Sequence, residues 1–155
     1  MPKRKSRVQQ ETLALYCGVM ARYSILDHTA DTGIEAHATS LAGLIEALAT
    51  GMFALVAEDL AGSHGTARIE VSADNETDLV YEALSELLYR SELDGLAFHR
   101  FEVALEDERK LKISATGARL DQLQLTGPPI KAVTYHDMSV SQNSDGWHGR
   151  VYFDV

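Results

Sequence analysis

Two carboxylates and an imidazole lie within five residues of this chain, in the segment Asp27-His28-Thr29-Ala30-Asp31. Carboxylate oxygens are preferred ligands of hard divalent cations such as calcium and magnesium. Asp27 and Asp31 would lie roughly 13 Å apart in an extended strand, whereas in a turn the two side chains can converge on one ion. The segment therefore predicts cation chemistry only if a strand ends at it.

A third oxygen donor stands far away in the sequence, at Asp154. Asp154 alternates with Phe153 and Val155 in a predicted final strand, beside the terminal carboxylate of Val155. Asp27 and Asp31 can supply two ligands of a cation and Asp154 a third, if the fold brings these distant residues together. The alternative is that the acids are solvated, with Asp27 accepting hydrogen bonds from backbone amides of a turn.

Besides the carboxylates, three polar residues could carry chemistry: His28, His136 and Lys131. Neither histidine has a paired nucleophile at a recognisable spacing, and such histidines are more often hydrogen-bonded structural residues. The chain also lacks a GxGxxG segment, a Walker loop, an HExxH segment and a nucleophile elbow. We therefore expect a protein that is not an enzyme. Lys131 is either a solubilising surface charge or a contact to a phosphate or carboxylate of a partner.

The charge of the chain is unevenly distributed. The formal net charge is −9, but the sequence from Met20 onward holds ten of the 14 basic residues and 22 of the 23 acidic residues, a net of −12. Nucleic acids bind chiefly to Lys and Arg side chains that neutralise phosphates. We therefore expect little direct nucleic-acid binding, and a cation or a basic protein surface as the partner.

The first nineteen residues differ in composition from the rest, with a basic start followed by a mostly apolar run at 13–21. This run is too short to cross a bilayer, which needs about 20 residues, and no convincing signal-peptide cleavage site follows it. We expect residues 1–19 to form a disordered extension, with Met20 as an alternative start, and residues 20–155 to form one domain. The single cysteine, Cys17, excludes an internal disulfide and fits a reducing, cytoplasmic compartment.

Hydrophobic spacing predicts the elements that must position these residues. Alternating apolar residues predict two short strands, one before and one after the segment 27–31. Ser40 is a good N-cap for a helix whose apolar residues recur at intervals of three, four, seven and eight. The apolar stripe of this helix consists of Leu41, Leu44, Ile45, Leu48, Met52, Phe53 and Val56.

The same reasoning predicts a strand at 66–72, a second helix that Asp74 caps and Gly95 ends, and two hairpins in the remaining sequence. The hairpins turn at 106–109 and 141–146, and a polar loop separates them. The stripe of the second helix consists of Leu79, Val80, Ala83, Leu84, Leu87 and Leu88. This order predicts a single-domain α+β fold, with two helices packed on a mainly antiparallel β-sheet.

Three segments together resemble one family, the archeases. They are DHTAD at 27–31, the segment Lys131-Ala132-Val133-Thr134-Tyr135-His136, and the stretch that runs from Asp145-Gly146-Trp147 to Phe153-Asp154-Val155. The segments follow one another in the order that the family shows, and the match covers about residues 22–155. Each motif alone is weak, but the three at these separations are specific.

The resemblance implies a small cytoplasmic protein without catalytic activity of its own. Archeases assist the GTP-dependent RNA-splicing ligase, which joins RNA ends in tRNA splicing and RNA repair, by promoting its guanylylation and multiple turnover. Carried over to this chain, the resemblance implies a divalent cation such as calcium, bound by Asp31, Asp154 and Val155. It also implies that Lys131 belongs to the surface that binds the ligase. Asp27 and His28 match the motif as well, and we assign them to the architecture of the turn.

Two other functions stay open on the sequence. The same carboxylates could serve a metal-dependent phosphoesterase, although the chain offers no nucleophile and few cationic residues for a phosphate. A general adaptor or chaperone would bind its partners without depending on Asp31, Lys131 or the C-terminal residue. The rate of ligase guanylylation, measured with and without the protein, distinguishes an activator from both.

Overall fold

The computed structural model describes residues 12–16, 19–27 and 32–155. These residues form eight strands, two long helices and one short 3-10 helix. In chain order the elements are β1 Thr12–Tyr16, β2 Val19–Asp27, β3 Thr32–Ala38, α1 Leu41–Ala54, β4 Gly65–Ser72, α2 Glu76–Asp94, β5 Leu96–Asp107, β6 Lys110–Arg119, η2 Leu120–Gln122, β7 Ala132–Asn143 and β8 Gly146–Asp154.

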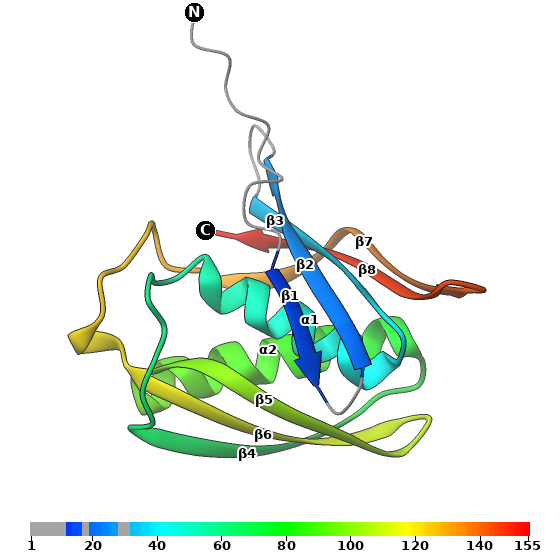
Figure 1. Cartoon of the computed structure of the whole chain (residues 1–155), viewed down its shortest axis with the longest axis horizontal. Coiled ribbons are helices and arrows are strands. Elements are labelled where there is room, and N and C mark those ends of the chain that lie inside the picture. The colour runs from blue at the N-terminus through cyan, green and yellow to red at the C-terminus, as the bar shows by residue number, and fades with distance from the viewer. Residues whose placement is uncertain (1–11, 17–18, 28–31) are drawn as a thin grey trace, which may run out of the picture.

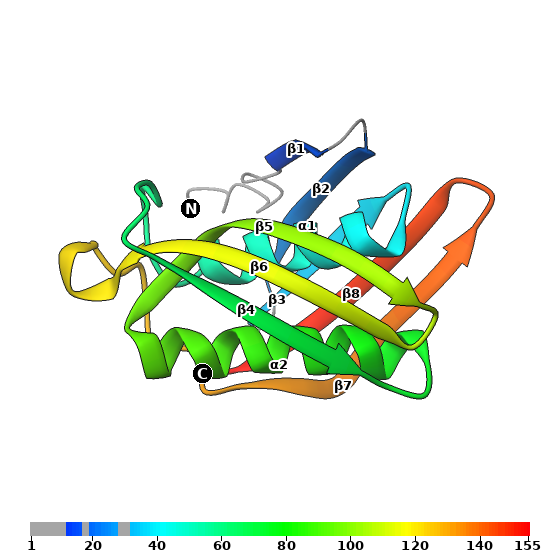
Figure 2. The same ribbon diagram turned by 90° about the horizontal axis from the view of Figure 1, so that it is seen from below.

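The strands form two antiparallel sheets with the two helices between them (Figure 1). One sheet has the order β1-β2-β3-β8-β7, and the other has the order β4-β6-β5. Figure 2 shows the three-stranded sheet lying across the helices. The predicted α+β class and antiparallel pairing are confirmed. The strands divide between two sheets, where one was expected, because α1 carries the chain across to β4, which then pairs with β6 and not with β3.

The N-terminal segment differs from the expected disordered extension over residues 1–19. Thr12–Tyr16 forms β1, which pairs antiparallel with β2 and extends the larger sheet by one edge strand. The sequence TLALY contains residue types that favour strands, and an unpaired edge of β2 is a template for them. Residues 1–11 and 17–18, including Cys17, lie outside the described residues.

Helix α1 begins where the sequence predicts, because the Ser40 side chain accepts a hydrogen bond from the Gly43 amide at 3.0 Å. Its predicted stripe is buried from Leu41 to Phe53, and the helix ends at Ala54, before Val56. Gly51 lies in the last turn of the helix, and glycine within a helix is usually unfavourable. A Cβ at this position would lie only 2.8 Å from the Tyr23 ring, so the glycine lets α1 pack closely on β2.

Helix α2 begins at a different cap from the one predicted. Asn75, not Asp74, occupies the N-cap position, and its side chain accepts a hydrogen bond from the Asp78 amide at 2.9 Å. The two residues are adjacent and both are good caps, so the sequence alone does not separate them. The predicted apolar stripe is buried, and Gly95 ends the helix in a left-handed conformation with φ of 67°. Among the described residues, neither helix is long and apolar enough to cross a membrane.

Both predicted hairpins are present, as β5 with β6 and β7 with β8. Strand β5 closes the core against α1 through aromatic side chains. The Phe53 ring meets the Phe98 ring edge-on, with centroids 5.5 Å apart, and stacks at 6.0 Å on the Phe101 ring. This contact joins the helix layer to the three-stranded sheet.

One carboxylate is buried where α1 crosses β5. The Glu46 side chain accepts a hydrogen bond from the Val103 amide at 3.0 Å and is almost fully shielded from solvent. Burial raises the pKa of Glu46, the hydrogen bond from Val103 lowers it, and the nearby charge of Glu102 raises it again. A raised pKa means that the fold favours the protonated acid. The stability linked to that proton is therefore present below pH 4.5 and is lost as pH rises through the raised pKa.

We therefore predict that Glu46→Gln stabilises the protein at pH 7. Gln keeps an oxygen that accepts from Val103 and removes the buried charge, so Tm should rise by about 2–4 °C, the change that ~1 kcal/mol produces in a chain of this size. The difference should shrink as pH falls below 4.5. Glu108→Gln, at an exposed turn, serves as the control. Thermal unfolding in which Glu46→Gln melts below the wild type at pH 7 would contradict this account.

Candidate functional site at one end of the five-stranded sheet

Strand β8 lies between β3 and β7, and this position brings Asp27 of the first motif, Lys131 of the second and the last residues of the third to one end of the sheet. Phe153 pairs with Thr32 on one side and with Val133 on the other. Thr32 in turn pairs with Asp27 on β2. Asp27, Thr32, Val133 and Phe153 are thus neighbours at one sheet end. The segment 28–31 connects the first two, Lys131 comes two residues before Val133, and residues 154–155 follow Phe153.

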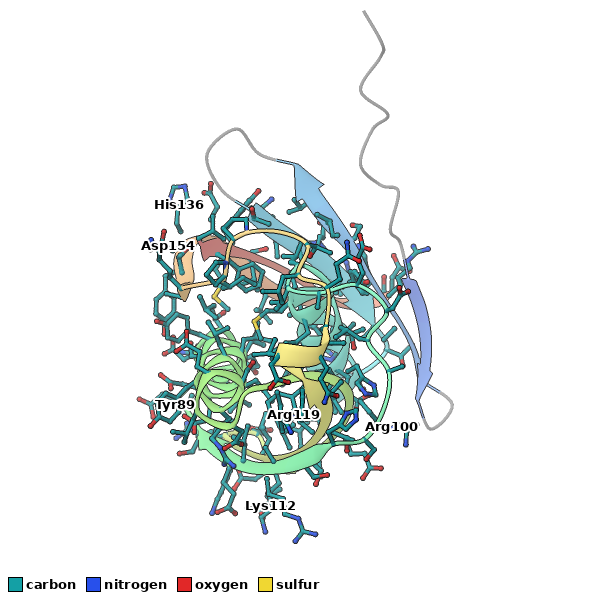
Figure 3. All side chains as sticks on the ribbon, turned by 90° about the vertical axis from the view of Figure 1, so that its left-hand side faces the viewer. Tyr89, Arg100, Lys112, Arg119, His136 and Asp154 are labelled. Atoms are coloured by element: carbon teal, nitrogen blue, oxygen red, sulfur yellow. The ribbon has the colours of Figure 1, made fainter. Side chains whose placement is uncertain are left out.

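A backbone hydrogen bond joins two of the predicted site residues directly. The Lys131 amide donates to the Asp154 carbonyl at 2.7 Å, just beyond the last rung of the β7–β8 ladder. Lys131 and Asp154 are both exposed, and Val155 is 37% exposed. Figure 3 shows Asp154 at this end, near His136. Within the part of the chain that the structure describes, no hydrogen bond or ion pair engages the Asp154 carboxylate, so its oxygens are available to a ligand.

The remaining residues of the predicted cation site are described in part. Strand β2 ends at Asp27 and β3 begins at Thr32, so a strand break does occur at the DHTAD segment. Asp31 and His28 lie outside the described residues, as does the side chain of Asp27. The cation site formed by Asp31, Asp154 and Val155 therefore stays a prediction.

The Tyr152 ring packs against the sheet one residue away from this end. Tyr152 of β8 pairs with Gly33 of β3, and its ring lies over the glycine, so that a Cβ at Gly33 would come within 2.6 Å of a ring carbon. The Tyr152 side chain is largely buried, and its ring centroid lies 6.5 Å from that of His136. Gly33 thus lets the Tyr152 ring pack directly against the backbone of β3.

We predict that Gly33→Ala destabilises the protein by about 1–3 kcal/mol, the usual cost of forcing an extra methyl group into a packed site. Gly127→Ala is the matched control, because nothing lies within 4 Å of a Cβ built there. Chemical denaturation of the two variants measures the difference. Equal stability of the two variants would show that the Tyr152 ring moves away at little cost.

Strand β7 is interrupted by a large bulge that begins within the Lys131 segment, after Thr134. Between Thr134 and Ser139 it advances five residues while β8 advances two, from Tyr152 to Arg150. Asp137 in the bulge has a φ of 51°, a conformation that non-glycine residues adopt uncommonly. His136 is therefore turned outward, with a 68% exposed side chain and its Nε2 3.3 Å from an Asp137 carboxylate oxygen.

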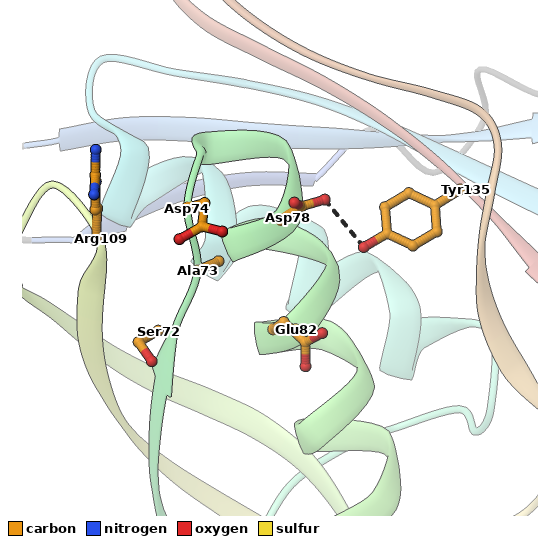
Figure 4. A pocket seen from close by; sticks show the side chains of 7 residues that line it. All are labelled: Ser72, Ala73, Asp74, Asp78, Glu82, Arg109 and Tyr135. Carbon is orange, nitrogen blue, oxygen red and sulfur yellow. Dashed lines mark hydrogen bonds between the residues drawn. The ribbon is translucent and has the colours of Figure 1, made fainter.

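The same bulge directs Tyr135 toward the start of α2. Its hydroxyl donates to the Asp78 carboxylate at 3.1 Å, and its ring stacks on Tyr81 with centroids 3.9 Å apart. Figure 4 shows this contact at the edge of a pocket of about 450 Å³. The pocket is lined by Ser72, Ala73, Asp74, Asp78, Glu82, Arg109 and Tyr135. Partial burial and then the Asp78 hydrogen bond raise the pKa of Tyr135 to about 12.

The raised pKa predicts that Tyr135 titrates at unusually high pH. The fold favours the protonated phenol, so this contribution to stability is present below pH 10.0 and is lost as pH rises through about 12. Tyrosinate absorbance should therefore show one step near pH 12. Tyr135→Phe should remove that step, and Asp78→Asn should move it to lower pH. The control Tyr89→Phe, at an exposed position of α2, should leave it in place. A step that survives in Tyr135→Phe would mean that another tyrosine titrates there.

Sequence reasoning missed a second polar cluster, formed by Glu35, His37 and His148. Their potential ligand atoms all lie within 4.8 Å of one another. The signal in the sequence is weak, since Glu35 and His37 merely alternate with the apolar residues of β3. Nothing in the sequence indicates that β8, more than a hundred positions away, pairs with β3.

Comparisons with known proteins agree with this architecture. The structure is similar to the solution structure of protein 1598 from Methanobacterium thermoautotrophicum, with a TM-score of 0.71, 25% identity, and coverage of 86% of this chain and 98% of that one. The crystal structure of a Thermotoga maritima protein described as an archease and possible chaperone matches with a TM-score of 0.56 and 20% identity, over 84% of this chain and 94% of that one, which bears on the fold alone. The fold thus defines a small α+β protein of the type found in these two structures.

Sequence comparisons then give the family. The model of the Archease protein family (MTH1598/TM1083) matches residues 23–155. The chain is 33% identical to the archease of Pyrococcus abyssi, over 88% of this chain and all of that protein. It is also 33% identical to the archease of Methanosarcina barkeri, over 86% of this chain and 96% of that protein. The chain belongs to the archease family.

Proposed function

We propose that the protein is a non-catalytic activator of a GTP-dependent RNA-splicing ligase in the cytoplasm, promoting its guanylylation and multiple turnover in tRNA splicing and RNA repair. Membership of the archease family and the meeting of Lys131 with Asp154 at one sheet end support this proposal. The acidic body offers charge complementarity to a basic, RNA-binding ligase while repelling free RNA.

The sheet end fits a hard divalent cation. Asp154 presents a carboxylate without a partner among the described residues, and Val155 follows it at a partly exposed position. Oxygen donors of this kind suit calcium. We propose that Asp31, Asp154 and Val155 hold the ion, which supplies positive charge between acids that would otherwise repel one another. Asp154 and Asp31 then fasten the end of β8 to the end of β3.

Lys131 has a separate role in this proposal. Its backbone is held beside Asp154 by the 2.7 Å hydrogen bond, and the residue is exposed. The ammonium group reaches a phosphate or carboxylate of the ligase, and the surrounding acids bind basic side chains. The activator thus orders the ligase active site by contact and transfers no group itself.

The activity test measures guanylylation and turnover of a cognate ligase with and without the protein. Asp154→Asn and Lys131→Ala should each reduce the stimulation, by at least about tenfold for the loss of a cation ligand. Asp145→Asn, in the turn at the opposite end of β8, and Lys110→Ala, on the other sheet, are matched controls that should keep it. An unstimulated ligase, or stimulation that Asp154→Asn and Lys131→Ala leave intact, would falsify the proposal in favour of a general adaptor or chaperone.

The cation site has its own test. Calorimetric titration with calcium should show binding to the wild type and to Asp145→Asn. Asp154→Asn and deletion of Val155 should weaken binding by at least about tenfold, while circular dichroism shows an unchanged fold. Unchanged calcium affinity in the Val155 deletion removes this residue from the ligand set.

A further inference from the structure

A cluster of metal-ligating side chains lies on the outer face of the five-stranded sheet, away from the acidic sheet end. On β3 the residues Ile34, Ala36 and Ala38 are buried against the helix layer, so Glu35 and His37 project from the opposite face. On β8 His148 pairs directly with His37. Side chains of directly paired residues on one face are close neighbours, and the diagonal position of Glu35 is within reach of a long side chain.

The three side chains already converge. Glu35 and His148 are hydrogen-bonded through Oε1 and Nε2, and the imidazole centroids of His37 and His148 lie 4.5 Å apart at an interplanar angle of 47°. The side chains of His148 and Glu35 are only 23% and 31% exposed. One nitrogen from each histidine and one oxygen from Glu35 lie within 4.8 Å of one another.

We propose that Glu35, His37 and His148 bind a divalent transition-metal ion of the zinc type. Two imidazole nitrogens and one carboxylate oxygen are a known set of three protein ligands for an open zinc site, in which water takes the fourth position. Imidazole suits zinc, whereas calcium prefers oxygen ligands. The donor set thus differs in kind from the oxygen donors proposed at Asp154.

Small side-chain movements suffice to form the site. Two donors that each lie about 2.0–2.1 Å from a tetrahedral zinc ion are roughly 3.3 Å from one another. The hydrogen-bonded donors of Glu35 and His148 must therefore separate slightly, and any donor as far as 4.8 Å from another must move closer. The Glu35–His148 contact has already brought two donors together, and the ion replaces the proton that they share. The His37 ring already contacts the His148 ring, and its nitrogen supplies the third bond.

Two arginines flank the cluster and shape its selectivity. Arg22 of β2 pairs with His37, and Arg150 of β8 pairs with Glu35. Their positive charges oppose a cation that is held only by electrostatic attraction. The Arg150 Nε donates to the Asp137 carbonyl at 3.1 Å, which holds this guanidinium on the β7 side. The site therefore favours ions that form strong bonds to imidazole.

The cluster is separate from the sheet end. Thr32 is three positions from Glu35 and five from His37 on β3, which corresponds to roughly 10 Å and 17 Å along an extended strand. This inference does not rest on the proposed ligase activity, because its residues are different and its readout is metal binding alone.

The test is calorimetric titration of the full chain with zinc, together with the visible absorption spectrum of the protein loaded with Co²⁺. The wild type should bind one zinc ion at this cluster. His148→Gln, Glu35→Gln and His37→Gln should each weaken zinc binding by at least about tenfold and alter the Co²⁺ spectrum. His37→Gln is the variant least able to disturb packing, because His37 is exposed. His136→Gln, an exposed histidine outside the cluster, and Asp154→Asn should bind zinc like the wild type.

The proposal is overturned if the wild type binds no zinc, or if His37→Gln and Glu35→Gln bind it with unchanged affinity. It is also overturned if Asp154→Asn removes the binding, since zinc would then occupy the sheet end. Zinc binding that persists in the presence of excess calcium supports two distinct sites.

Discussion

The placement of β8 between β3 and β7 is the constraint on which the rest of this structure depends. Both edges of β8 are hydrogen-bonded, and its register against each neighbour determines which side chains meet. A shift of one residue would turn the whole strand over, moving Val151 and Phe153 out of the core and His148 into it. Burial of one face of β8 therefore specifies the register. The register in turn determines which polar residues are neighbours on the opposite face and at the sheet end.

The helix layer makes this arrangement rigid. Helix α1 packs on the larger sheet near Tyr23 and on the smaller sheet through Phe53, and α2 likewise contacts β7 of one sheet and β4 of the other. The two helices together therefore fix the sheets relative to one another. The backbone ladder stops at the sheet end at Asp154, where we propose the calcium site, and it is deformed at the bulge 135–138. Polar backbone and side-chain groups are available to ligands there because regular pairing does not use them.

Much of the fold follows from local pattern. Ser40, the apolar stripes of the helices, Gly95 and the hairpin turns are local signals, and the structure has the elements that they indicate. Asp74 and Asn75 are adjacent and both are good N-cap residues, so the sequence pattern does not show at which of the two the helix begins. The division into two sheets and the β3–β8 pairing are non-local features. They depend on the paths of α1 and α2 through the fold, which local sequence patterns do not specify.

Part of the candidate site was likewise predictable from sequence motifs, and part was not. The motifs around Asp154 and Lys131 are recognisable in sequence, and the structure brings those two residues together. The cluster at His148 was not predictable, because its members become neighbours only through strand register. The turn of Tyr135 toward Asp78 was also missed, since a bulge in β7 has no clear signature in the sequence.

The order of strands also has a kinetic consequence. Residues that pair between β3 and β8 are separated by 109 positions at one end, Ala38 with Trp147, and by 121 at the other, Thr32 with Phe153. Closing such long loops costs chain entropy before any contact repays it, so folding is expected to be slow for a chain of this size. Until β8 inserts, β3 presents an open edge that can pair with other chains. The strand that assembles the polar sites is thus also the one that protects the folding protein from aggregation.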